Sequence, residues 1–356
     1  MRVGVPKETK PMEGRVGLIP AACTDLLRAG HSVYVERGAG LGSGYPDSAY
    51  AALGVKVVDD AEQLYAAVEL IVKVKEPIDA DLRWLRPEHT LFCYLHLAAD
   101  RALTERLQAI GLTAVAFETV EVAGRLPLLA PMSDIAGRLA AQIGAQLLHQ
   151  PQGGKGLLLG GLPGVERGRV VVIGAGQAGG SATAVAAALG AEVTVFDRLH
   201  GRLEAMRALG PNVTALYPYA EAVDAAVVAA DLLIGAVLIP GARATHVVSA
   251  GQVRRMTPGS VIVDISVDQG GCIETTRPTT YADPTYRVDE VVHFCVTNMP
   301  GAVPHSASQA LSAAILPYVL RLAGDPDWRD DPALVQGVNV AAGEVCHPAV
   351  REAMAG

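Results

Sequence analysis

A glycine-rich turn at residues 174–179 has the residue types and spacing of a dinucleotide site. It reads Gly-Ala-Gly-Gln-Ala-Gly, follows the apolar stretch Val170–Ile173 and leads into the small-residue stretch Gly180–Leu189. In a strand–turn–helix unit the first glycine permits a tight turn, the second lets the backbone approach a pyrophosphate, and the third lets the helix pack closely. Asp197 follows 23 residues after the first glycine, which is typical of a ribose-binding carboxylate.

Asp197 also indicates which dinucleotide binds. A carboxylate at this position accepts a hydrogen bond from a ribose 2′-hydroxyl and repels a 2′-phosphate, so it favours NAD over NADP. Arg198 weakens this preference without reversing it. The alternative is a structural glycine turn in a domain that binds no nucleotide. The second glycine-rich stretch, around Lys155, lacks the spacing and the Ser/Thr of a phosphate-binding loop and is predicted to be a connector.

Three ionisable residues of the first third are expected at one edge of a sheet. Lys75 ends the predicted strand Leu70–Lys75, His96 ends Thr90–His96, and Arg15 lies in the loop after the first strand. Arg and Lys can hold a substrate carboxylate, and histidine can exchange protons near neutral pH. Each residue also has a structural interpretation. Arg15 could be a surface charge, Lys75 could pair with its acidic neighbour, and His96 could be a hydrogen-bonded histidine at a strand end. Their convergence favours a chemical site.

The second half of the chain offers polar residues at equivalent positions. Asp268 and Asn298 each follow a predicted strand, at the edge where such a domain presents groups to a nicotinamide. Asp268 could also be only a turn former. Asp264 lies within its strand and is expected to hydrogen-bond to neighbouring backbone. His293 and Cys295 alternate on one strand, which favours packing over metal binding, and we expect no metal site.

The pattern of elements predicts an α/β fold with two doubly wound parallel-sheet domains, the second a Rossmann NAD-binding domain. Short apolar, β-branched stretches alternate with Ala- and Leu-rich helical stretches, as in parallel sheets covered on both faces. The helical stretch Ser306–Ala323 is followed by too few residues to start a third domain, so we expect it to return to the first. The expected domains are residues 1–127 with 306–356, for substrate and catalysis, and 128–305, for NAD. The expected strands are Arg2–Val5, Ser32–Glu36, Val55–Val58, Leu70–Lys75, Thr90–His96, Thr113–Glu118, Val170–Ile173, Glu192–Phe196, Leu232–Ile234, Val261–Ile265 and His293–Thr297.

Composition narrows the function classes. The 356 residues carry a formal charge of −8 with no basic run, so nucleic-acid binding is not expected. The most apolar stretch is far shorter than the roughly 20 residues needed to span a membrane, and no signal peptide opens the chain, so we expect a cytoplasmic protein. The odd, scattered cysteines favour neither disulfides nor zinc: Cys23, Cys93, Cys272, Cys295 and Cys346.

The ordered motifs resemble those of the alanine dehydrogenase family, which is related to the nucleotide-binding part of proton-translocating nicotinamide nucleotide transhydrogenase. The resemblance covers roughly residues 1–323. It rests on Gly4-Val5-Pro6-Lys7-Glu8, Arg15-Val16, Lys73-Val74-Lys75-Glu76-Pro77, Leu95-His96-Leu97-Ala98, Leu128-Leu129-Ala130-Pro131-Met132-Ser133, Gly174–Gly179, Asp268-Gln269-Gly270-Gly271, Arg277-Pro278-Thr279-Thr280 and Asn298-Met299-Pro300.

The resemblance implies a role for each matched residue. Arg15 and Lys75 match residues that bind the substrate carboxylate and carbonyl, His96 the catalytic acid/base, and Asp268 the residue that positions water or ammonia. The implied reaction converts L-alanine, NAD⁺ and water reversibly into pyruvate, ammonium and NADH, in a homo-oligomer that is typically a hexamer. The implied NAD contacts are Ser133, Gly174, Gly176, Gln177, Ala178, Gly179, Asp197, Arg202, Val237, Leu238, Ile265, Arg277, Val296, Asn298 and Met299.

Three alternatives remain at the level of sequence. The chain could oxidise another small 2-amino acid, because one methylene in a pocket changes discrimination by only ~1–3 kcal/mol. It could be a transhydrogenase-like NAD(H)-binding subunit with a membrane partner, although that role would not require the whole carboxylate-binding set. It could also be a non-catalytic NAD-binding regulator.

Overall fold

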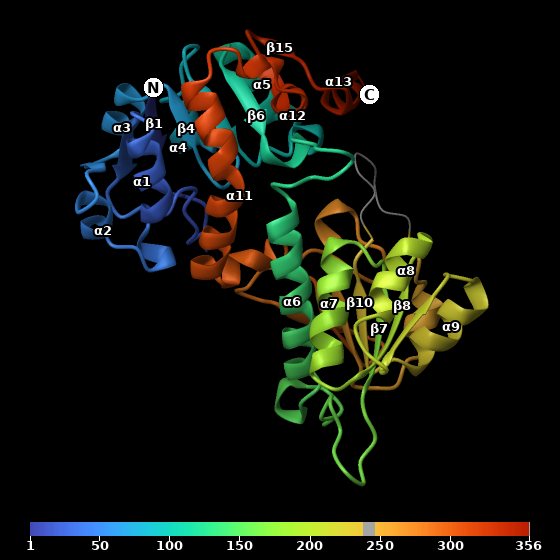
Figure 1. The fold of residues 1–356 in the computed structure, drawn as a ribbon. Helices are drawn as coiled ribbons and strands as arrows, with labels where there is room; N and C mark the ends of the chain where they lie inside the picture. The colour runs from blue at the N-terminus through green and yellow to red at the C-terminus, as the bar shows by residue number, and fades with distance from the viewer. Residues whose placement is uncertain (238–245, 356) are drawn as a thin grey trace. The chain divides into compact units, whose positions relative to one another are not determined.

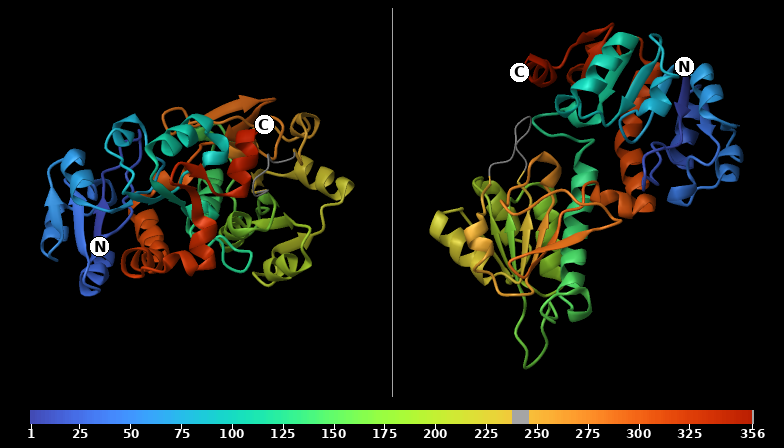
Figure 2. Two further views of the ribbon diagram at one scale, coloured as in Figure 1. Left: turned by 90° about the horizontal axis from the view of Figure 1, so that it is seen from above. Right: turned by 180° about the vertical axis from the view of Figure 1, so that it is seen from behind.

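The computed structural model describes residues 1–237 and 246–355, apart from the side chain of Gln269. The chain forms two compact units (Figures 1 and 2). Unit 1 contains Met1–Met132 together with Gly301–Gly356, and unit 2 contains Ser133–Pro300. Each unit has a parallel-dominated sheet interleaved with helices, which confirms the predicted α/β class.

The sheet of unit 1 has the strand order β15-β14-β6-β5-β4-β1-β2-β3. β1 to β6 are parallel, whereas β14 is antiparallel to β6 and β15 to β14. The order reverses direction between β1 and β4, so the loops after these two strands leave on opposite sides of a crevice. The strands are β1 (Arg2–Val5), β2 (Ser32–Glu36), β3 (Lys56–Val58), β4 (Leu70–Val72), β5 (Thr90–Cys93), β6 (Thr113–Ala116), β14 (Val338–Ala341) and β15 (Glu344–Val345).

Helices cover this sheet, and Figure 1 shows the long α11 beside α1. The hydroxyl of Ser308 on α11 accepts a hydrogen bond from the Val16 N–H at 2.9 Å, so the returning helix fixes the loop that contains Arg15. The helices of unit 1 are α1 (Pro20–Arg28), α2 (Asp47–Ala51), α3 (Ala61–Ala67), α4 (Asp79–Leu82), α5 (Arg101–Ile110), α11 (Pro304–Gly324), α12 (Pro332–Gly337) and α13 (Pro348–Ala355).

The sheet of unit 2 has the order β12-β13-β11-β10-β7-β8-β9, with β12 antiparallel and the other strands parallel. Counted from β7, this is the Rossmann order, with the switch point between β7 and β10. The strands are β7 (Arg169–Ile173), β8 (Glu192–Phe196), β9 (Val213–Leu216), β10 (Leu232–Gly235), β11 (Val261–Asp264), β12 (Thr285–Val288) and β13 (Val291–Phe294). The helices are α6 (Ala130–Leu147), which begins in unit 1, α7 (Gln177–Ala188), α8 (His200–Arg207), α9 (Ala220–Ala229) and α10 (Ala250–Val253).

Helices α6 and α7 pack in close backbone contact in unit 2 (Figure 1). A Cβ on Gly137 of α6 would lie 2.0 Å from the carbonyl oxygen of Ala178, so only glycine fits there. The Ser181 hydroxyl of α7 donates to Asp134 of α6. The small residues after the glycine turn therefore allow α6 to buttress the helix that the turn begins.

Several strands have other bounds than expected: β6 ends at Ala116 rather than Glu118, and β13 spans Val291–Phe294 rather than His293–Thr297. β4 ends at Val72 and β5 at Cys93, so Lys75 and His96 lie beyond the strands rather than at their last residues. In addition, β9, β12, β14 and β15 were not predicted. β9 and the edge strands β12 and β15 carry partly exposed residues, and such strands lack the continuous apolar signal of a buried parallel strand. Among the described helices, none is long and apolar enough to cross a membrane.

Candidate active site

Unit 1 gathers three of the predicted site residues at the carboxyl edge of its sheet. Arg15 follows β1, Lys75 follows β4 and His96 follows β5, and these three strands are neighbours. Ligands of open α/β sheets bind at this edge, next to the switch point. The topology therefore brings the two cations and the histidine to one side of one sheet.

Arg15 is buried and held by Glu13. Its Nε and Nη2 donate to the two carboxylate oxygens of Glu13 at 2.7 and 2.5 Å, and Nη1 donates to the Met132 sulfur at 3.2 Å. Burial would lower the pKa of Arg15, but Glu13 outweighs it and raises the pKa, so the guanidinium stays charged. Because a thioether is a weak acceptor, a ligand carboxylate would be a stronger partner for Nη1 than Met132.

Lys75 lies in a mixed charge cluster. Its Nζ is 3.6 Å from Glu76, and Lys10 pairs with the other oxygen of Glu76. Burial alone would raise the pKa of Glu76, but Lys75 and Lys10 outweigh it and lower the pKa, so this carboxylate stays ionised. Two lysines share one carboxylate, so these three side chains together carry a net charge of +1.

A buried ion network lies beneath the Lys75 loop. Lys73 Nζ is 3.6 Å from Glu8 and 3.2 Å from Asp81, and all three residues are buried. Glu8 also accepts a hydrogen bond from the Val74 N–H at 2.7 Å. Burial would lower the pKa of Lys73, but its two carboxylate neighbours raise it. This network ties the chain after β1 to the segment that presents Lys75.

His96 has a left-handed backbone, with φ 52° and ψ 33°, and a part-exposed side chain. Its N–H donates to Glu118 at 2.6 Å, and the buried Leu95 N–H is 3.2 Å from each oxygen of the same carboxylate. Nδ1 of His96 lies 4.0 Å from Glu118. Sequence reasoning missed Glu118, although it ends the predicted strand Thr113–Glu118, whose carboxyl end meets the same edge of the sheet.

Tyr94 is a second residue that the sequence did not indicate. Its ring stacks on the imidazole of His96, with centroids 6.0 Å apart and planes 7° from parallel, and its hydroxyl donates to the Leu128 carbonyl at 2.6 Å. Burial raises the pKa of the Tyr94 phenol, and nearby Arg15 opposes that rise. The neutral ring therefore forms one wall between the arginine and the histidine.

In unit 2 the glycine turn leads from β7 into α7 as predicted, and its geometry suits a dinucleotide. Gly174 has φ +99°, and a Cβ there would lie 2.6 Å from the Ala236 carbonyl oxygen. A Cβ on Gly179 would lie 1.7 Å from the Gly174 oxygen. At Gly176, by contrast, the nearest atom is Arg202 Nη1 at 3.9 Å, so the open room there fits a pyrophosphate against the backbone and the N-terminus of α7.

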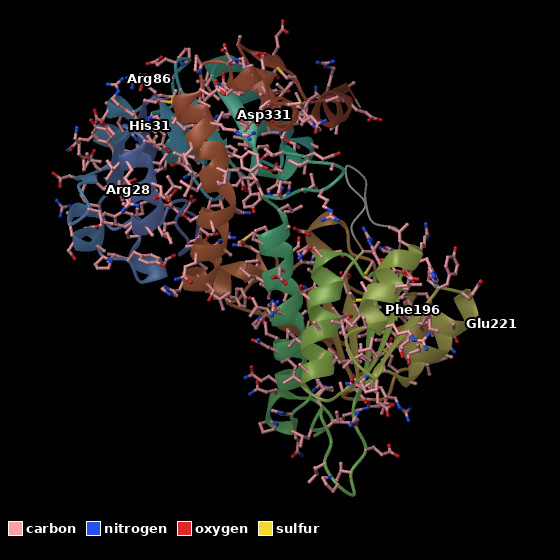
Figure 3. All side chains as sticks on the ribbon, viewed as in Figure 1. Arg28, His31, Arg86, Phe196, Glu221 and Asp331 are labelled. Atoms are coloured by element: carbon pink, nitrogen blue, oxygen red, sulfur yellow. The ribbon has the colours of Figure 1, made fainter. Side chains whose placement is uncertain are left out.

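Asp197 follows Phe196, the last residue of β8, which Figure 3 labels. Its carboxylate accepts the Ala175 N–H and the Leu199 N–H, both at 2.8 Å, and lies 3.3 Å from Arg202 Nη1. Asp197 thus holds the glycine turn in place and lies directly beside it. It fits the ribose-binding position, and the half-exposed Arg202 adds positive charge to the same turn.

The loop after β11 presents Asp268. Asp264, at the end of the strand, is fully buried and accepts hydrogen bonds from the Ser266 and Cys272 N–H groups, which confirms its expected bonding to nearby backbone. Burial raises the pKa of Asp264, and hydrogen bonds from Thr276, Ser266 and Cys272 oppose that rise. Asp268 itself is exposed, on the short 3₁₀ turn Val267–Gln269.

The remaining candidate residues of unit 2 lie after its strands or on the helices α6 and α7. The Arg277 guanidinium lies over the Tyr286 ring at 4.2 Å, and Asn298 has φ 62°. Ser133 lies on α6, and Gln177 and Ala178 begin α7. Val237 follows β10, and Ile265 follows β11. Val296 and Met299 follow β13, and both are buried. Leu238 lies outside the described residues. Within residues 1–237 and 246–355 no cluster of His, Cys, Asp or Glu could hold a metal ion.

The fold and these residues define a two-domain α/β protein with a Rossmann unit and a separate unit whose sheet edge carries Arg, Lys and His. Family models for the alanine dehydrogenase/PNT N-terminal and C-terminal domains match residues 4–136 and 140–348. This chain therefore belongs to the alanine dehydrogenase/PNT family.

Individual relatives agree with this placement. The chain is 47% identical to an alanine dehydrogenase of Mycolicibacterium smegmatis, with 98% of this chain and 96% of that protein covered. A solved structure of an L-alanine dehydrogenase superposes with a TM-score of 0.96 at 50% identity, covering 100% of this chain and 99% of that one. A transhydrogenase from Sinorhizobium meliloti superposes with a TM-score of 0.85 at 26% identity, covering 98% and 100%.

Proposed function

We propose that this protein is an L-alanine dehydrogenase, which catalyses the reversible NAD-dependent oxidative deamination of L-alanine to pyruvate and ammonium. The observation that carries the proposal is the set Arg15, Lys75 and His96 at the carboxyl edge of neighbouring strands in unit 1. In this proposal unit 1 binds the substrate and unit 2 binds NAD. Relatives that are 47–49% identical over nearly the whole chain support it.

In unit 1 the charge of each side chain determines its proposed role. The Arg15 guanidinium, kept charged by Glu13, binds the alanine carboxylate, and the Lys75 ammonium polarises the oxygen that becomes the pyruvate carbonyl. His96 takes a proton from the attacking water and later gives one to the departing nitrogen. Asp268 of unit 2 orients the water, or ammonia in the reverse direction.

NAD⁺, when bound, supplies the hydride acceptor. The protein provides the glycine backbone and the α7 N-terminus for the pyrophosphate and Asp197 for the adenosine ribose. In the forward direction alanine, NAD⁺ and water yield pyruvate, ammonium, NADH and one proton, so rising pH favours oxidation by mass action. The cytoplasm is the proposed location, supported by five cysteines that all remain thiols.

A screen of amino acids tests the substrate assignment. Purified protein is mixed with NAD⁺ and each small L-amino acid, and NADH formation is followed by absorbance. We expect the highest kcat/KM with L-alanine and the reverse reaction with pyruvate and ammonium. A higher kcat/KM with another 2-amino acid would replace the substrate. Hydride exchange between nucleotides without any amino-acid turnover would favour a transhydrogenase-like role instead.

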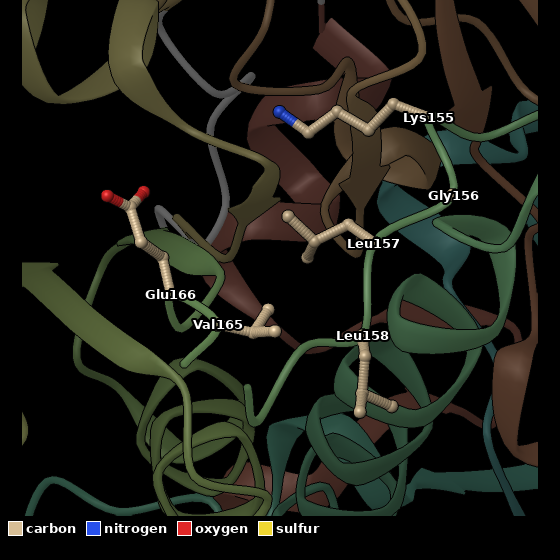
Figure 4. A pocket seen from close by; sticks show the side chains of 6 residues that line it. All are labelled: Lys155, Gly156, Leu157, Leu158, Val165 and Glu166. Carbon is tan, nitrogen blue, oxygen red and sulfur yellow. The ribbon is translucent and has the colours of Figure 1, made fainter. Parts of the chain in front are cut away.

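We also propose that the protein is a homo-oligomer, with a hexamer as the expected state. The support is the segment between α6 and β7, which extends away from the sheet in Figures 1 and 2. Leu158, Leu162 and Val165 are each more than half exposed there, and Leu158 and Val165 line the pocket of Figure 4. Exposed aliphatic groups of this kind mark protein interfaces.

Light scattering on the parent and on Leu158→Asp tests this proposal. The substitution is expected to lower the mass, whereas Leu41→Asp, at an equally exposed leucine of unit 1, is the control and should leave it unchanged. A monomeric parent would refute the oligomer.

A further inference from the structure

We infer that Asp264 is a positioning residue that fixes the loop presenting Asp268, and that Thr276 is its partner in this role. The inference rests on the proposed function, because it concerns the residue assigned to orient water or ammonia. Asp264 is buried at the end of β11, and Asp268 is exposed on the loop that follows it. Asp264 would act through the loop alone.

The carboxylate of Asp264 closes both ends of the loop. Oδ1 accepts the Ser266 N–H at 3.0 Å, two residues before Asp268, and Oδ2 accepts the Cys272 N–H at 3.0 Å, four residues after it. Oδ2 also lies 2.7 Å from the Thr276 hydroxyl. One buried side chain therefore bonds to the backbone on both sides of the 3₁₀ turn that carries Asp268.

The surroundings of this carboxylate are fitted to it. A Cβ on Gly235 at the end of β10 would lie 3.0 Å from Oδ1, and a Cβ on Gly271 would lie 2.9 Å from Oδ2. Gly271 also has φ +72°, which disfavours any other residue. The two glycines leave room for the Asp264 head group and allow the loop to fold around it.

The groups that point at Asp264 are donors. The backbone N–H groups of Ser266, Cys272 and Ile273, the Thr276 hydroxyl and, at 3.8 Å, the Cys272 thiol approach the two oxygens. The Thr276 hydroxyl also lies 2.8 Å from the Ile273 carbonyl, but its one proton favours the charged acceptor. An asparagine would turn an amide NH₂ toward at least one donor, so the ionised carboxylate is the form that satisfies the loop.

Thr276→Val tests the inference with the smallest change. It removes one bond to Asp264 at a half-buried position and keeps the shape of the side chain. Thr276→Ser keeps the hydroxyl and is the conservative rescue, and Thr280→Val, the same change at an exposed threonine, is the control. Two readouts are taken on the full-length protein: amide hydrogen exchange of residues 265–272, and kcat with alanine and NAD⁺.

We expect Thr276→Val to raise exchange in the loop and to lower kcat, each about tenfold, with KM for NAD⁺ within twofold of the parent. Thr276→Ser and Thr280→Val should match the parent. In an Asp268→Asn background, Thr276→Val should lower kcat no further, because both changes act on one group.

A parental exchange rate, a parental kcat in an active enzyme, or an additive effect in the Asp268→Asn background would each overturn the inference. A parent protein that gives no alanine turnover would refute the proposed function, and hydrogen exchange would then decide the inference by itself. Asp264→Asn is the stronger variant, and it should raise exchange in the same loop more than Thr276→Val does.

Discussion

Replacing Glu118 by alanine should disable His96 without touching it. The carboxylate is the acceptor for two consecutive N–H groups, those of Leu95 and His96. Leu95 is fully buried, so its N–H would be left without a partner at a cost of about 1–3 kcal/mol. The charge-assisted bond to the His96 N–H contributes about 1.5–3 kcal/mol, and the left-handed backbone of His96 would lose its restraint.

Because the two bonds share one acceptor they are not additive, and we expect Glu118→Ala to lower the free energy of unfolding by about 2–4 kcal/mol. Displacing the imidazole by about 1 Å should lower kcat on the order of a hundredfold. Glu118→Gln keeps one oxygen acceptor and should fall between the parent and Glu118→Ala.

The assay combines urea unfolding with steady-state alanine oxidation. Glu121→Ala, at an exposed glutamate three residues on, is the matched control and should leave both measurements unchanged. If Glu118→Ala kept the parental kcat and the parental unfolding midpoint, the argument that this carboxylate holds the His96 turn would be wrong.

Three further outcomes follow from the contacts. Burial, assisted by Arg86, lowers the pKa of His89. The neutral side chain therefore stabilises the fold fully above the unfolded pKa, and this stabilisation is lost as the pH falls through the folded pKa. Below pH 6.5 the free energy of unfolding, measured in urea, should fall with pH less steeply in His89→Gln than in the parent, by up to about 1.4 kcal/mol per pH unit. Gly179→Ala should abolish NAD binding in calorimetry because its Cβ would meet a backbone oxygen at 1.7 Å, whereas Gly201→Ala, whose Cβ meets nothing, should bind NAD normally and be about 0.5–1 kcal/mol more stable. Asp197→Ser should raise the ratio of kcat/KM for NADP⁺ to that for NAD⁺ at least tenfold, and an unchanged ratio would remove Asp197 from coenzyme selection.

The sequence predicts those parts of the fold whose signal is contained in a short stretch of consecutive residues. Val170–Ile173 followed by the glycine turn is a signal contained in a few residues, and the structure has that strand, turn and helix in place. The parallel strands β1, β2 and β8 have their expected bounds because each is a short stretch rich in β-branched residues with buried valines. The edge strand β15 is two residues long and carries no such signal, and it is a strand only through its antiparallel pairing with β14, which in turn pairs with β6.

The sequence indicated the charged candidates but not the residues that hold them. Arg15 could be read as a surface charge, and its burial with Glu13 depends on a loop whose course no periodicity predicts. Glu118 and Tyr94 reach His96 through strand order and a left-handed turn, which are properties of the folded sheet. Asp264 was expected to bond to nearby backbone, but its bonds to both sides of the Asp268 turn need the loop in three dimensions.

The proposed function requires that this protein oxidises L-alanine with NAD⁺ and that His96 moves the protons. The most direct measurement is the initial rate of alanine-dependent NADH formation by the purified parent and by His96→Ala, with NAD⁺ affinity measured on both. We expect turnover by the parent, loss of at least a hundredfold in kcat for the variant, and NAD⁺ affinity within twofold. A parent without alanine-dependent NADH formation, or a variant as fast as the parent, would contradict the proposal.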